Sequence, residues 1–209
     1  MQPQAFVEHL GRVRASAILR TSIQAAAAPA MDAAVRAGFR IVEFTLTTPE
    51  ALERIEEFSR REELVVGAGT VLSVADARAA VERGACFLVS PVVDVEVIRE
   101  AAALGVAMMP GTHTPTEMLL AHRAGAPLQK LFPAPGLGAD YVRACLGPLP
   151  FLRIVPTSGV DETNAADYLE AGAHAVGFVS PLFAPLDLQR GDFDRIEQRG
   201  RRLLASLRR

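Results

Sequence analysis

Residues 40–69 read RIVEFTLTTPEALERIEEFSRREELVVGAG and contain one repeat of the pattern that decides the fold. An apolar run at Arg40–Thr45 is followed by a helical pattern at Pro49–Arg60 and by a second apolar run at Leu64–Gly69. Both apolar runs are nearly continuous rather than alternating, which is typical of parallel strands covered by helices. The stretch therefore predicts two parallel strands joined by a helix.

The same rhythm continues on both sides of this stretch. The other predicted strands are Ala15–Arg20, Cys86–Ser90, Val106–Pro110, Leu128–Phe132, Leu152–Thr157 and Ala173–Val179. The other predicted helices are Ala26–Ala37, Val74–Arg83, Val93–Leu104, Pro115–Ala124, Ala139–Leu146, Glu162–Ala171 and Phe193–Leu207. Several of them are followed by a glycine suited to end a helix, namely Gly38, Gly84, Gly105, Gly125 and Gly172.

Eight strand–helix units in 209 residues leave about 26 residues for each unit. We therefore predict an α/β fold in which residues 1–209 form a single (β/α)8 TIM barrel domain with an extra N-terminal helical segment. A doubly wound open sheet is the alternative. Such a sheet more often has five or six strands and a glycine-rich loop after the first, whereas the first strand here ends in Leu19–Arg20–Thr21.

Composition excludes several classes of partner. The formal net charge is −2 and the pI is about 6.1, so no basic field attracts nucleic acid or an anionic membrane. Cys86 and Cys145 suit a reducing compartment, charged residues interrupt the first 20 positions, and no apolar run approaches the ~20 residues of a membrane span. We expect a cytoplasmic protein that acts on a small molecule.

Functional residues of a barrel lie where its strands end in the carboxyl direction. Those ends carry Arg20, Glu43, Thr45, Thr47, Gly69–Thr70, Ser90–Pro91, Pro110–Thr112, Lys130, Thr157–Gly159 and Gly177–Ser180. None of the four histidines belongs to a metal-binding pattern, and His113, the one nearest a strand end, reads as a loop residue. We predict no metal and no cofactor.

Lys130 is the only lysine, while the other 21 basic residues are arginine. It lies in the apolar run Leu128–Phe132 rather than on a helix face. A guanidinium cannot replace a primary amine in a Schiff base, and an apolar site lowers the pKa of a lysine toward the nucleophilic neutral amine. Lys130 is thus a candidate nucleophile; the alternative is a lysine that extends to solvent or pairs with a carboxylate.

Glu43 is a carboxylate within the apolar run Ile41–Thr45. Strand alternation places Val42 and Phe44 toward the helices and Glu43 inside the barrel. A partly desolvated carboxylate has a raised pKa and can move protons near neutrality, so Glu43 is a candidate general acid and base. The alternative is a structural ion pair with Arg20 or Lys130.

Two further signals concern hydroxyl groups and backbone amides. Thr70 follows the small residues Gly67–Gly69, where its hydroxyl can bind a carboxylate or orient water, although an ordinary turn has the same composition. Thr157–Gly159 and Gly177–Ser180 end the last two strands, where many barrels bind a phosphate on backbone N–H groups.

Taken in order, these segments resemble the 2-keto-3-deoxy-6-phosphogluconate (KDPG) aldolase family, which includes the 4-hydroxy-2-oxoglutarate (KHG) aldolases. The resemblance spans nearly the whole chain. It rests on the segments Ala17–Arg20, Val42–Leu46, Val66–Val71, Val89–Pro91, Met109–Thr112, Thr114–Glu117, Lys130–Ala134 and Val155–Thr157.

The resemblance implies a homotrimeric (β/α)8 barrel and a metal-independent aldolase that splits 2-keto acids into pyruvate and an aldehyde. It implies that Lys130 forms the Schiff base and that Glu43 is the general acid and base. The residues it assigns to the substrate are Arg20, Thr70, Pro91, Phe132 and Thr157. Those it assigns to a phosphate are Ser158, Gly159, Gly177, Phe178 and Ser180.

Departures from the family pattern affect the phosphate end. Ser158 and Val179 each carry a side chain where the family commonly has glycine, and Thr47 stands where some members have arginine. A Cβ at the first two positions could crowd a phosphate or oppose a backbone conformation that glycine tolerates. A non-phosphorylated substrate such as 4-hydroxy-2-oxoglutarate is therefore one alternative. A phosphosugar-binding or isomerising barrel without Schiff-base chemistry is another.

Overall fold

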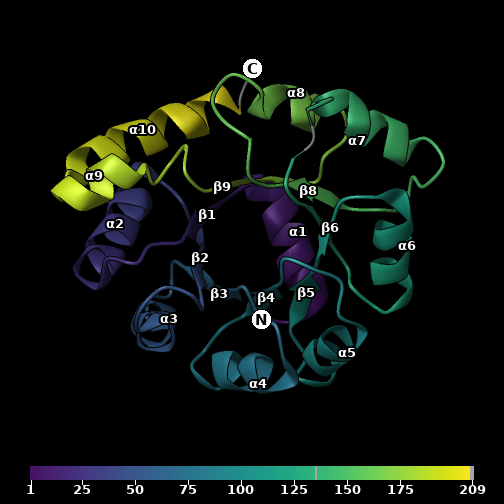
Figure 1. Ribbon diagram of the computed structural model, residues 1–209, viewed down its shortest axis with the longest axis horizontal. Coiled ribbons are helices and arrows are strands. Elements are labelled where there is room, and N and C mark those ends of the chain that lie inside the picture. Colours follow the sequence, from purple (N-terminus) through teal and green to yellow (C-terminus); the bar gives the residue numbers. More distant parts are fainter. Residues whose placement is uncertain (135, 208–209) are drawn as a thin grey trace.

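The computed structural model describes residues 1–134 and 136–207 (Figure 1). The strands are β1 (Ala15–Leu19), β2 (Ile41–Thr45), β3 (Val65–Gly69), β4 (Phe87–Val89), β5 (Ala107–Met109), β6 (Gly111–Thr112), β7 (Gln129–Leu131), β8 (Ile154–Pro156) and β9 (Val176–Phe178). The helices are α1 (Pro3–Val13), α2 (Gln24–Ala37), α3 (Ala51–Ser59), α4 (Val74–Glu82), α5 (Val95–Ala103), α6 (Pro115–Arg123), α7 (Ala139–Leu146), α8 (Ala165–Glu170), α9 (Pro185–Arg190) and α10 (Phe193–Ser206).

The strands are parallel and form two sheets. One sheet has six strands in the order β5-β4-β3-β2-β1-β9, and the other has the order β6-β7-β8. An isolated parallel bridge joins Thr157, after β8, to Gly177 in β9. Figure 1 shows the strands around a common centre with most of the helices outside them. The predicted parallel sheet covered by helices is confirmed, and the sheet curls as a half-barrel.

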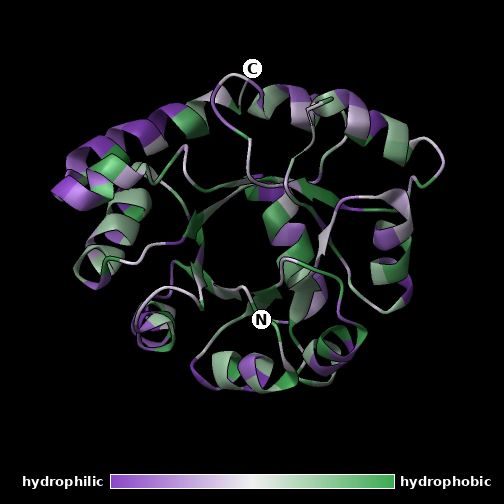
Figure 2. Cartoon of the chain, in the orientation of Figure 1, coloured by the Kyte–Doolittle hydropathy of each residue, from purple (hydrophilic) through white to green (hydrophobic). Residues whose placement is uncertain are grey.

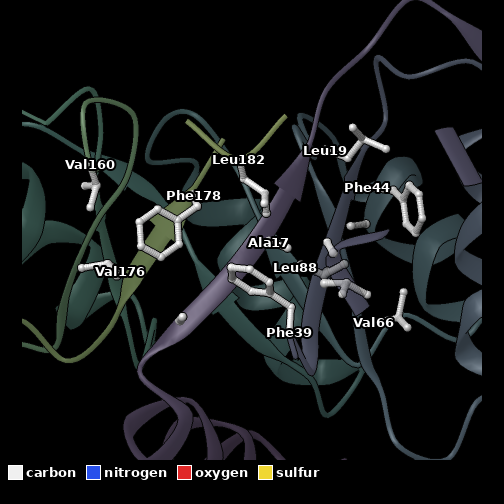
Figure 3. Packing of buried hydrophobic residues seen from close by; sticks show 14 of the residues in the cluster. Ala17, Leu19, Phe39, Phe44, Val66, Leu88, Val160, Val176, Phe178 and Leu182 are labelled. Carbon is white, nitrogen blue, oxygen red and sulfur yellow. The ribbon is translucent and has the colours of Figure 1, made fainter. Parts of the chain in front are cut away.

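The larger apolar core lies between the strands and the outer helices. Its strand residues are those whose side chains point away from the centre, such as Leu19, Phe44 and Phe178. Figure 3 shows several of them, and Phe44 meets Phe58 of α3 edge to face with ring centroids 5.1 Å apart. In Figure 2 the strands are mostly hydrophobic and α10 is strongly hydrophilic on its visible surface.

A second apolar core lies inside the curled sheet. The strands contribute inward side chains, among them Ile41, Val65 and Phe87, and α1 contributes Phe6, Val7 and Leu10. The rings of Phe6 and Phe87 stack with centroids 4.4 Å apart. The predicted N-terminal helical segment therefore fills one end of the sheet's interior (Figure 1).

The observed elements differ from the predicted ones at identifiable places. The strand predicted at Val106–Pro110 ends at Met109, and β6 follows as a separate strand after Pro110, which has no N–H for a sheet hydrogen bond. The helix predicted from Glu162 starts at Ala165, because Asp161 and Asn164 form loop hydrogen bonds before it. Helix α9 was not predicted. In the described part of the chain, no helix combines the length and the apolar character needed to cross a membrane.

Candidate active site

Strand alternation places two ionisable side chains inside the curled sheet. Val42 and Phe44 face the helices, so Glu43 between them points inward, as predicted. Lys130, in the middle of β7, is 5% exposed, and Glu43 is 0% exposed. An unpaired charge is costly at such depth, so these two groups set the chemistry of the interior.

Both backbone groups of Lys130, its N–H and its carbonyl, are hydrogen-bonded to the neighbouring segment Pro110–Thr112. The N–H of Lys130 donates to Pro110 at 2.9 Å, and the Thr112 hydroxyl donates to the Lys130 carbonyl at 3.0 Å. The Nζ atom lies 5.0 Å from the ring centroid of Phe132. Burial lowers the pKa of Lys130; the Glu43 charge opposes this shift and the Arg20 charge adds to it.

Glu43 is a buried carboxyl without a hydrogen-bond partner at either oxygen among the described residues. Burial raises its pKa, while the charges of Lys130 and Arg20 act in the opposite direction. Gly69 lies directly beneath the carboxyl group, and any Cβ at that position would collide with it. The carboxyl is therefore able to hold a proton at a pH where an exposed glutamate has lost it.

Arg20 and Thr70 come together from the ends of β1 and β3. An Arg20 Nη2–H donates to the Thr70 hydroxyl at 3.2 Å, and Arg20 is exposed. Thr70 has a φ of 60°, a left-handed conformation that is unfavourable for a β-branched residue. Strain of this kind persists where the surrounding structure demands one side-chain direction, and here it orients a hydroxyl beside a guanidinium.

Arg20 and Lys130 line a cavity of about 530 Å³ at the carboxyl end of the strands, whereas Thr70 is outside the lining and reaches it only through its hydrogen bond with Arg20. Its lining includes Arg20, Lys130, Phe132, Thr157, Ser158 and Ser180, all predicted site residues. Arg20 and Lys130 are the basic residues in this lining, and the Arg20 guanidinium gives the wall a positive charge. A small carboxylate that enters the cavity finds Arg20 and the buried amine side by side.

Other predicted residues lie outside the lining. Glu43 is buried behind it and acts on Lys130 through its charge. Pro91 packs with its backbone against Gly111, the residue paired with Lys130 in the sheet. Phe178 was predicted to contact a phosphate, but its side chain belongs to the outer apolar core, with its ring centroid 6.1 Å from that of Phe39 (Figure 3). It can therefore contribute to the cavity only through its backbone.

After β8 the backbone adopts the left-handed conformation that is expected where the family commonly has glycine at position 158. Ser158 has a φ of 65° and Gly159 a φ of 96°, so a serine occupies the left-handed region. The two residues form a bend after β8, and turns of this kind are among the backbone conformations from which anion-binding concavities are built. Gly177 is packed so closely against Thr157 and Ile18 that a Cβ would collide with both.

The sequence interpretation missed part of the cavity wall. Ser22 and Ile23 line it from the loop before α2. A second group lines it from α9 and the segment just before that helix, namely Phe183, Pro185, Leu188 and Gln189. With Thr21, which also lines the cavity, Ser22 and Ile23 form the segment that follows Arg20 directly, and that position is the signal that could have found them. The α9 residues had no such signal, because a six-residue helix is too short for a periodic pattern.

Comparison with known proteins adds independent information. The sequence model of the family described as KDPG and KHG aldolase matches residues 7–199. A probable 2-dehydro-3-deoxy-6-phosphogalactonate aldolase of Rhizobium meliloti (strain 1021) is 38% identical, covering 81% of each chain. The 2-dehydro-3-deoxy-phosphogluconate aldolase of Pseudomonas aeruginosa is 37% identical, covering 84% of this chain and 81% of its own. A native KDPGal structure superposes with a TM-score of 0.84 at 30% identity over 93% of this chain and 94% of its own.

Proposed function

This chain belongs to the KDPG and KHG aldolase family, and we propose that it cleaves 2-dehydro-3-deoxy-6-phosphogluconate-type 2-keto acids into pyruvate and glyceraldehyde 3-phosphate. It is a class I aldolase, an aldehyde-lyase. The observation that carries the proposal is a buried amine with a lowered pKa beside a buried carboxyl with a raised one, at the wall of the cavity. Family membership favours aldol cleavage over an isomerising or merely binding barrel.

Lys130 attacks as a neutral amine, and its burial favours that form by lowering the pKa. Its nitrogen attacks the C2 carbonyl of the substrate, and loss of water gives the imine. Arg20 and Thr70 hold the neighbouring carboxylate, with Pro91, Phe132 and Thr157 around the pyruvyl half. This arrangement places the new positive charge of the imine beside the C3–C4 bond.

Glu43 then moves protons. Its carboxylate takes the proton of the C4 hydroxyl, through water, as the C3–C4 bond breaks and the electron pair passes into the imine. The aldehyde leaves, Glu43 returns the proton to C3 of the enamine, and hydrolysis of the imine releases pyruvate. A general acid and base of this kind contributes about 10²–10⁴-fold to the rate.

A phosphate on the aldehyde half would bind at the ends of β8 and β9. The left-handed Ser158 and Gly159 support this placement, with Gly177, the Phe178 backbone and Ser180 on the other side. A second candidate is cleavage of non-phosphorylated 4-hydroxy-2-oxoglutarate. It is favoured by Val179, which lines the cavity together with Ser158 and Ser180 and carries a side chain where the family commonly has glycine.

Two experiments test the function. Borohydride reduction with pyruvate, followed by peptide mass mapping, is expected to place an adduct on Lys130 and none on Lys130→Arg. Glu43→Gln is expected to lower turnover about 10²-fold or more while adduct formation persists. An unmodified Lys130, or full turnover in Glu43→Gln, would contradict the mechanism.

A substrate panel tests the phosphate assignment separately. We expect a higher kcat/KM for 2-dehydro-3-deoxy-6-phosphogluconate than for the dephosphorylated compound, because N–H groups at the ends of β8 and β9 would bind the phosphate. Equal or better turnover without phosphate would favour the second candidate while leaving the Schiff-base chemistry intact.

We further infer that residues 1–209 form a single domain and that its two sheets close into one eight-stranded barrel, in which β5 and β6 count as one strand interrupted by the single residue Pro110. Support comes from the Thr157–Gly177 bridge and from the hydrogen bond of the Gly111 N–H to Ser90, which spans the break. The family resemblance supports a homotrimer. A cytoplasmic location and a place in the Entner–Doudoroff pathway stay predictions.

A further inference from the structure

Helix α9 supplies part of the cavity wall that is separate from the catalytic strands. Pro185, Leu188 and Gln189 line the cavity from this helix, together with Phe183 just before it. The helix follows β9, which is two strands away from β7 through β8 and the Thr157–Gly177 bridge. The part of a substrate that extends away from Lys130 toward β9 therefore meets α9.

This wall cannot hold its position through its own helical structure. Helix α9 has six residues, far fewer than the ~12–15 that an isolated helix needs to be even marginally stable. Only Asp187 and Leu188 among its residues are buried. The position of the wall must therefore come from contacts that α9 makes with its surroundings.

The strongest of these contacts is a buried ion pair. Asp187, whose side chain is 4% exposed, accepts a short hydrogen bond from an Nη2–H of Arg199 in α10. Arg199 is 17% exposed and also donates to the carbonyl of Leu182 at 2.9 Å. One guanidinium thus joins α10 both to α9 and to the segment that leads into it. Loss of Asp187 leaves the Arg199 guanidinium without its carboxylate, and loss of Arg199 leaves the buried Asp187 with only the longer contact to the exposed Arg195, at 3.8 Å.

Helix α10 is a firm support for this pair. Gly200 lies so close to α2 that a Cβ would collide with Ala37, and Ile196 and Leu203 are buried on the same helix. Glu197 pairs with Arg36 of α2 at 2.7 Å. Helix α2 begins at the cavity, with Ser22 and Ile23 just before it, and contacts α9 as well as α10, so α10 holds α9 next to a part of the wall that is itself fixed.

We propose that Asp187 and Arg199 are positioning residues that set selectivity for the aldehyde half of the substrate, by holding Leu188 and Gln189 in the cavity wall. This inference rests on the proposed function. A substrate with a long aldehyde half depends on the pair, since its far end meets α9. A substrate with a two-carbon aldehyde half depends on it much less, because its reacting atoms stay near Lys130.

The test compares two substrates in each variant. We measure kcat/KM for 2-dehydro-3-deoxy-6-phosphogluconate and for 4-hydroxy-2-oxoglutarate in Asp187→Asn, Arg199→Met and the double variant. Each single change is expected to lower the ratio of the long to the short substrate about tenfold, since small displacements of positioning groups cost one to two orders of magnitude. The double variant is expected to match the single ones, because both changes break one contact.

Asp32→Asn is the matched control, because Asp32 pairs with Arg61 at 2.6 Å between segments that do not line the cavity. Its ratio is expected to stay within twofold of the natural protein. A ratio unchanged in Asp187→Asn, or additive effects in the double variant, would overturn the proposal even if the melting temperature falls.

If the Asp187 and Arg199 variants do not fold, Gln189→Ala tests the same wall without breaking the ion pair, since Gln189 is exposed on α9 and lines the cavity. It is expected to lower the same ratio at least threefold, and an unchanged ratio would overturn the proposal. Borohydride trapping of pyruvate on the natural protein separates the two levels: absence of an adduct refutes the proposed function itself, whereas an adduct with an unchanged ratio refutes the role of α9 alone.

Discussion

At the scale of single residues, the site depends on three charges that oppose one another. Glu43 raises the pKa of Lys130, whereas burial and Arg20 lower it. Sequence reasoning found all three residues. Lys130 and Glu43 stand out as charged residues in apolar strands, and Arg20 stands at the carboxyl end of a predicted strand. The same reasoning pointed to a glycine-like backbone at Ser158 only through the family pattern, and it did not find that Thr70 adopts a left-handed backbone, since local propensity disfavours this conformation and only the packed strand ends impose it.

Two substitutions are predicted to move the pH dependence of imine formation in opposite directions. Glu43→Gln removes a charge that favours the ammonium, so the pKa of Lys130 falls and reductive trapping of saturating pyruvate extends to lower pH. Arg20→Met removes a charge that disfavours the ammonium, so trapping requires a higher pH. The rate of adduct formation across pH, followed by mass spectrometry, measures both shifts. Arg36→Met serves as a distant control, and shifts in the same direction would show that these charges do not act on Lys130.

At the scale of elements, sequence periodicity predicted the strands and the long helices but not α9 or the break between β5 and β6. Long elements bury a repeating face that can be read from the sequence. Helix α9 instead depends on the ion pair between Asp187 and Arg199 of α10, and a contact between two separate elements cannot be read from a local sequence pattern. The helical segment at the N-terminus was expected, whereas its insertion into the interior of the sheet was not.

The insertion of α1 predicts a stability effect remote from catalysis. Phe6 is 1% exposed and stacks on Phe87, so Phe6→Ala is expected to lower the free energy of unfolding by about 3–5 kcal/mol. Urea denaturation measures this loss. Trapping of pyruvate on Lys130 under native conditions is expected to stay near that of the natural protein. Gln4→Ala, on the exposed side of α1, is the control; a loss below 1 kcal/mol for Phe6→Ala would show that α1 contributes little to the core.

At the scale of the whole molecule, burial of Lys130 is a cost to folding. Its pKa in the folded protein lies below the ordinary value of 10.5, so the unfolded chain binds the proton more readily between those two values. The stability of the natural protein therefore decreases through this window as the pH falls. The amine required for the chemistry is in this sense a destabilising group.

Lys130→Met is predicted to remove this pH-dependent cost. Relative to the natural protein, the variant is expected to become more stable as the pH is lowered from about 10 toward neutrality, so the difference between their free energies of unfolding increases in favour of the variant. Chemical denaturation at several pH values measures the difference, in which the titrations of other groups largely cancel. A difference that is constant with pH would mean that Lys130 keeps its ordinary pKa in the folded protein.

The helix inserted at one end of the interior also determines by which route the substrate enters and the products leave in the proposed reaction. Phe6, Val7 and Leu10 occupy that end, so reactants enter and products depart through the same opening at the strands' carboxyl ends. Pyruvate stays covalently attached to Lys130 at the inner part of this blind chamber, while the aldehyde half is formed nearer to the opening. Release is consequently ordered, with the aldehyde first and pyruvate last.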